Sequence, residues 1–66
     1  MERGVIVSFD RGSGRGTISR AGNSEVQFSA EHILGRDRTS LKKGDNVWFE
    51  LENIQNNNVA INIRKG

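Results

Sequence analysis

Hydrophobic and polar residues alternate with a period of two along most of this chain, which predicts β-strands. Five segments follow the pattern: VIVSF (5–9), GTIS (16–19), EVQF (25–28), VWFELE (47–52) and VAINIR (59–64). In the fourth segment, Val47, Phe49 and Leu51 share one face, so Trp48 is expected to point to the other face. Each strand is therefore predicted to be buried on one side and solvated on the other.

The same alternation predicts which side chains fill the interior. In VAINIR it puts Val59, Ile61 and Ile63 on one face and Ala60 on the opposite face. The expected core combines the inward positions of all segments: Ile6, Ile18, Val26, Phe28, Ile33, Val47, Phe49, Leu51, Ile61 and Ile63.

Turn-forming residues separate the segments. AGNS (21–24) predicts a short hairpin connection, KKGD (42–45) a tight turn, and NIQNNN (53–58) an asparagine-rich loop. SAEHILG (29–35) has room for one or two helical turns. Five short strands with glycine-rich turns and no long helix indicate an all-β fold, a small closed or partly closed antiparallel barrel. The sequence shows no repeat or internal boundary, so residues 1–66 are expected to form a single domain.

Composition limits the chemistry available to the chain. It has 66 residues, no cysteine and one histidine, so neither disulfides nor a cysteine or multi-histidine metal site is expected. No apolar run is long enough to span a membrane or to form a signal-peptide core, which favours a soluble cytoplasmic protein. No combination of residues points to catalysis or to a cofactor, so we expect a protein that is not an enzyme. The net charge of +2 permits an anionic partner without requiring one.

The segment SFDRGSGRGTIS (8–19) places three glycines between two predicted strands. A phosphate-binding loop of the nucleotide type is disfavoured, because the residues after Gly16 are too few and too β-like to form the helix that such a loop needs. A disordered segment is also disfavoured, since Phe9 and Ile18 anchor its two ends. Glycines that let the strands bend at a barrel corner fit the pattern better.

Six consecutive stretches of the chain carry a family resemblance: GVIVSFD (4–10), SGRGTI (13–18), EVQFS (25–29), AEHI (30–33), LKKGDNVWFE (41–50) and AINI (60–63). Over its full length and without gaps, the chain resembles the bacterial cold-shock domain. That resemblance implies a five-stranded OB-fold barrel that binds single-stranded RNA and DNA. It also implies that SFDRGSGRGTIS belongs to the strand pair that carries the nucleic-acid-binding face.

The resemblance further implies that most aromatic residues of that face are replaced here. Positions where the family has a stacking ring hold other residues: Ser8, Arg15, Thr17, Gln27, Ser29, Ala30 and Arg38. Phosphate-contacting basic positions of the family are also changed: Val7, Ser13 and Asn56. Phe9 remains, although its position also suits the core. This chain is thus expected to be a divergent member that lacks most of the stacking residues.

Arginines offer a replacement for the missing rings, because a guanidinium group can stack on a base or bind a phosphate. The expected nucleic-acid contacts are Phe9, Arg11, Arg15, Arg20, Gln27 and Arg38, with Arg36 nearby in sequence. Binding through such a face would be weak, mainly electrostatic and sensitive to salt. Gene regulation or RNA chaperoning, without chemistry, would be the corresponding role.

A second class of function, the alternative to nucleic-acid binding, is also consistent with these substitutions, because exposed rings are lost when a domain stops binding nucleic acid. The barrel would then serve as a protein-interaction or regulatory module. Trp48 is the candidate interface residue, since an outward tryptophan often anchors a protein partner, although it also suits packing against a neighbouring strand or loop. His32 has no cysteine partners, so we expect it to be structural or solvent-facing.

Overall fold

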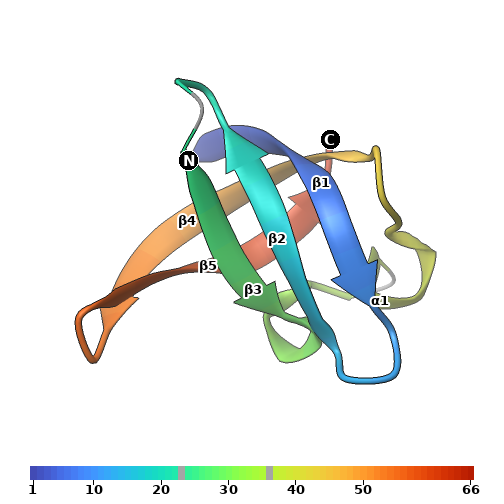
Figure 1. The fold of residues 1–66 in the computed structure, drawn as a ribbon. Coiled ribbons are helices and arrows are strands. Elements are labelled where there is room, and N and C mark those ends of the chain that lie inside the picture. The colour runs from blue at the N-terminus through green and yellow to red at the C-terminus, as the bar shows by residue number, and fades with distance from the viewer. Residues whose placement is uncertain (23, 36) are drawn as a thin grey trace.

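The structure is a computed structural model that describes residues 1–22, 24–35 and 37–66. Asn23 of the expected AGNS turn, and Arg36, lie outside these described residues. In the described part of the chain, five strands close into a barrel in the order β1-β2-β3-β5-β4, which confirms the all-β prediction (Figure 1). The strands are β1 (Glu2–Asp10), β2 (Arg15–Arg20), β3 (Glu25–Ser29), β4 (Asn46–Ile54) and β5 (Asn57–Lys65).

Two short helical elements, η1 (Ala30–His32) and α1 (Asp37–Ser40), lie between β3 and β4. The first is the short helical turn expected within SAEHILG. Figure 1 shows β1, β2 and β3 side by side, with the long β4–β5 hairpin crossing behind them. Neighbouring strands are antiparallel except at the β3–β5 seam, where they run parallel. The connection through η1 and α1 makes this parallel seam possible, because it carries the chain across to the far side of the barrel.

One row of inward positions passes through all five described strands. Its members are neighbours across each strand pair: Phe9, Gly16, Phe28, Ala60 and Leu51. Large and small residues alternate along this row, as a narrow barrel requires if it is to be filled by its own side chains. Phe28 and Ala60 are buried, while Phe9 and Leu51 are half-buried and pack against the core.

The strict alternation expected for VAINIR is wrong. Ala60 and Ile63 are both buried, whereas Ile61 is only half-buried. The cause is a bulge in β5, because Trp48 pairs with Arg64 but Glu50 pairs with Ile61. Asn62 adopts a left-handed backbone with φ 51°, which inserts one extra residue and returns Ile63 to the interior.

The rest of the expected core is confirmed, with Leu51 half-buried. Leu41, which was not expected, is fully buried in the segment after α1, where its backbone N–H donates to the Asp37 carbonyl. The asparagine-rich loop expected over 53–58 is also wrong, because β4 and β5 extend until only Gln55 and Asn56 connect them. Both of these residues have positive φ, 52° and 67°, the conformation that best joins twisted antiparallel strands through two residues.

Gly16 is the tightest point of the inward row. A Cβ atom added there would lie 2.5 Å from Cζ of Phe28 and 2.5 Å from the Ser8 carbonyl oxygen. Neither neighbour has space to retreat, since the ring is buried and the carbonyl belongs to β1. The glycine is therefore required by close packing between strands rather than by turn formation, which differs from the corner role expected of this stretch.

Replacing Gly16 by alanine is expected to lower the free energy of unfolding by about 1 to 3 kcal/mol, because the methyl group overpacks the row. The matched control is Gly12→Ala, whose new Cβ would meet only the exposed Asp10 carboxylate, at 3.2 Å. Urea unfolding of both variants measures the difference. Equal transition midpoints for the two would contradict the packing argument.

Candidate nucleic-acid interface

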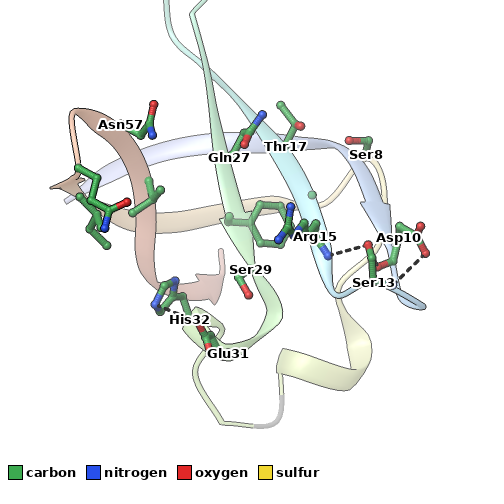
Figure 2. A pocket seen from close by; sticks show the side chains of 15 residues that line it. Ser8, Asp10, Ser13, Arg15, Thr17, Gln27, Ser29, Glu31, His32 and Asn57 are labelled. Atoms are coloured by element: carbon green, nitrogen blue, oxygen red, sulfur yellow. Dashed lines mark hydrogen bonds and ion pairs between the residues drawn. The ribbon is translucent and has the colours of Figure 1, made fainter.

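A groove of about 590 Å³ crosses the outer surface of β1, β2 and β3 and reaches the tip of the β4–β5 hairpin (Figure 2). Most of the residues that line it are polar, and they come from β1, the turn after it, β2, β3, η1 and the β4–β5 hairpin. The lining residues are Ser8, Asp10, Ser13, Arg15, Gly16, Thr17, Gln27, Phe28, Ser29, Glu31, His32, Ile54, Gln55, Asn57 and Val59.

Strand register builds the floor of the groove from two outward rows. The first row is Ser8, Thr17, Gln27 and Val59, and the second is Asp10, Arg15 and Ser29. Each row lies beside the inward row, because successive side chains of a strand point to opposite faces. A bulge in β1 between Ile6 and Ser8 is needed to bring Ser8 opposite Thr17. The structure thus brings together five positions that the resemblance assigned to one binding face: Ser8, Arg15, Thr17, Gln27 and Ser29.

The turn between β1 and β2 is fixed by hydrogen bonds rather than left open. The Asp10 carboxylate accepts from the backbone N–H of Gly12 at 2.8 Å, and the Gly14 N–H donates to the Asp10 carbonyl at 2.8 Å. The Gly14 carbonyl in turn accepts from the Ala30 N–H at 2.6 Å. The end of the groove near Arg15 is therefore held to η1, which carries the opposite wall.

Charge in the groove is sparse and mixed. Arg15 is exposed, and its side chain makes no hydrogen bond or ion pair with any residue that the structure describes. Asp10 and Glu31 are the two carboxylates of the lining, and besides Arg15 and His32 the other lining residues have no ionisable side chain. Arg15 is thus the one arginine or lysine among the lining residues, and attraction for an anion is concentrated around it.

The other arginines of the expected contact set lie elsewhere. Arg11 donates to the carbonyl oxygens of Thr39 at 3.0 Å and Leu41 at 2.8 Å, with its guanidinium 5.8 Å from the Phe9 ring centroid. Arg20 forms a two-point ion pair with Glu2, at 2.9 and 3.2 Å. Neither they nor Arg38, which is exposed on α1, line the groove. As nucleic-acid contacts, all three stay predictions.

The two aromatic candidates also differ in position. Phe9 is half-buried, with its ring centroid 5.3 Å from that of Phe28, and it does not line the groove. Trp48 points outward, as predicted, but is only half-exposed. The Arg3 guanidinium lies 5.4 Å from its ring centroid, and the C-terminal Gly66 is beside the indole edge. Trp48 is therefore partly covered by the protein itself.

His32 is one of the lining residues that sequence reasoning missed. It ends η1 and presents its imidazole to the groove, with 32% of the side chain exposed. The sequence offered no signal for this position, because a lone histidine in a short helical turn has no periodicity to show which way it points. Its placement is determined by the buried Ile33, which bridges to Ile63 of β5.

Comparison with known proteins agrees with this geometry. Residues 2–66 match the family described as the "Cold-shock" DNA-binding domain. Cold shock-like protein CspB of Yersinia pestis and of Yersinia enterocolitica are each 41% identical over 63 residues, covering 91% of this chain and 87% of the relative. The chain therefore belongs to the cold-shock domain family, as the resemblance implied.

A solved structure extends the agreement to the backbone. The structure titled drosophila Unr CSD456 superimposes with a TM-score of 0.81 and 23% identity over 98% of this chain. This chain spans 26% of that longer one, so the likeness concerns the fold alone.

The family to which this chain belongs is described as DNA-binding, which agrees with the expectation of a protein that is not an enzyme. Within the described residues, no three His, Cys, Asp or Glu side chains gather closely enough to hold a metal ion. No helix in the same ranges has the length and apolar character needed to cross a membrane.

Arg11→Ala is expected to lower the free energy of unfolding by about 1 to 3 kcal/mol, since it removes two charge-assisted hydrogen bonds that join the β1–β2 turn to the segment before β4. Arg15→Ala is the matched control, because it deletes the same side chain from a position without such bonds. Urea unfolding of both variants checks this. Similar losses in the two would show that Arg11 does not clamp the turn.

Proposed function

We propose that this protein binds single-stranded nucleic acid weakly in the groove over β1, β2 and β3, with Arg15 as its electrostatic anchor. The observation that carries the proposal is the groove itself, whose floor is built from positions that the resemblance to the cold-shock domain assigns to one binding face. An extended strand fits an open, elongated surface with one cation and many hydrogen-bonding groups. A double helix would not fit, because its bases are paired with each other and are not exposed to such a surface.

We also propose that this chain is a divergent member of the cold-shock domain family that lacks most of the stacking rings. Among the lining residues, aromatic rings come only from Phe28 and His32, and Phe28 is 3% exposed. Each base stacked on an aromatic side chain contributes about 1 to 3 kcal/mol by truncation. A groove with so few rings therefore binds more weakly than one lined with them.

Hydrogen bonds from neutral side chains supply the rest of the interaction. Thr17, Gln27 and Ser29 lie next to one another on β2 and β3, where they can meet phosphate, sugar or base edges. The corresponding activity is passive and cytoplasmic, holding a strand extended against base pairing, as in gene regulation or RNA chaperoning. The alternative, a protein-interaction module centred on Trp48, gains no support from a ring that Arg3 and Gly66 partly cover.

Arg15→Ala is expected to weaken binding of a fluorescent single-stranded oligonucleotide by about threefold or more at low salt. It should also make the dependence of log K on log salt shallower by about 0.7, the value for one phosphate contact on a single strand. Fluorescence anisotropy at several salt concentrations, with RNA and DNA probes, measures both quantities.

Arg64→Ala is the matched control, because Arg64 is exposed but does not line the groove. It lies on β5, opposite Trp48 of the neighbouring strand β4. It should leave both the affinity and the slope close to the wild-type values. Equal effects of the two substitutions would indicate diffuse charge attraction instead of a site. Absence of binding by the wild type at low salt would overturn the proposed function.

A further inference from the structure

His32 occupies a fixed place in the groove that its sequence position did not suggest. The backbone on both sides is tied down, since the Ile33 N–H donates to the Ala30 carbonyl at 3.1 Å and the Leu34 N–H donates to the Ile63 carbonyl at 2.7 Å. Ile33 is 1% exposed and Ala30 packs against the core. The imidazole is thus presented from a rigid base, as a preorganised contact requires.

The ring nitrogens of His32 do little for the fold. Nδ1 is buried and has no hydrogen-bond partner among the described residues. Nε2 lies 3.9 Å from Oε1 of Glu31, whose side chain is 76% exposed. A histidine kept for structural reasons normally uses its nitrogens in hydrogen bonds, because a buried unpaired polar atom destabilises the protein. About a third of the side chain is exposed, and this part does not include Nδ1. It is available for contact with a binding partner.

The lining residues contributed by the β4–β5 hairpin suit a nucleobase. Ile54, which is 41% exposed, and Val59 are apolar, while Gln55 and Asn57 carry carboxamides that can pair with base edges. Figure 2 shows His32 beside Glu31 and Ser29, with Arg15 at the far side of β3. One part of the groove thus has the His32 ring and the apolar side chains of the hairpin. Another part has the Arg15 guanidinium, which can bind a phosphate.

We propose that His32 is a base-contacting residue of this groove, stacking its ring on an unpaired nucleobase. This inference rests on the proposed function and specifies one contact of the same site. Imidazole rings are among the platforms on which single-stranded bases stack.

The experiment measures the Kd of a rhodamine-labelled oligothymidylate by anisotropy at pH 7. His32→Phe keeps a ring and should retain the wild-type affinity. His32→Ala removes the ring and should lose about fivefold or more in affinity.

Urea unfolding checks that the variants are folded, and His32→Gln, which keeps a polar side chain without ring or charge, replaces His32→Ala if the alanine variant is not. Wild-type affinity in the alanine or glutamine variant would overturn this inference and leave the proposed function in place. Absence of binding by the wild type would overturn both.

Discussion

The structure depends on the packing of Phe28 across Gly16. These residues are neighbours between β2 and β3, and the same inward row continues to Ala60 at the parallel seam that closes the barrel. A side chain larger than hydrogen at position 16 would collide with the ring and with the β1 backbone. A chain of 66 residues buries only about 60% of its unfolded surface, so its free energy of unfolding is small. The free energy lost by overpacking this one row would be a large fraction of it.

The geometry of the groove depends on the inward row that contains Gly16 and Phe28. Because inward and outward residues alternate, fixing Gly16 and Phe28 also fixes Arg15, Thr17 and Gln27 on the other face of the sheet. The proposed binding surface is thus a rigid floor rather than a set of independent loops. The proposed divergence lies in its composition, since this scaffold carries hydroxyl, carboxamide and guanidinium groups where the family resemblance implies stacking rings. Fold and site are therefore separable, and affinity follows from the side chains displayed.

Much of the fold was predictable from the sequence, because period-two alternation identifies buried positions such as Ile18 and Phe49 directly. The exceptions have local physical causes. Asn62 resets the alternation by adopting positive φ, and Ala60 is too small to be recognised as a core residue by hydrophobicity. The site was less predictable. Arg11 and Arg15 look equivalent in sequence, but Arg11 binds carbonyls 28 and 30 positions away, and only the folded chain reveals this.

The central claim, that the groove and not the surface around Trp48 is where this protein meets its partner, is tested most directly by NMR. A ¹⁵N-labelled sample is titrated with an unlabelled single-stranded oligonucleotide at low salt. If the strand binds in the groove, shift changes are expected at Arg15, Thr17, Gln27 and other groove residues, with the Trp48 indole N–H unmoved. Changes confined to the Trp48 signals, or no changes anywhere, would contradict it.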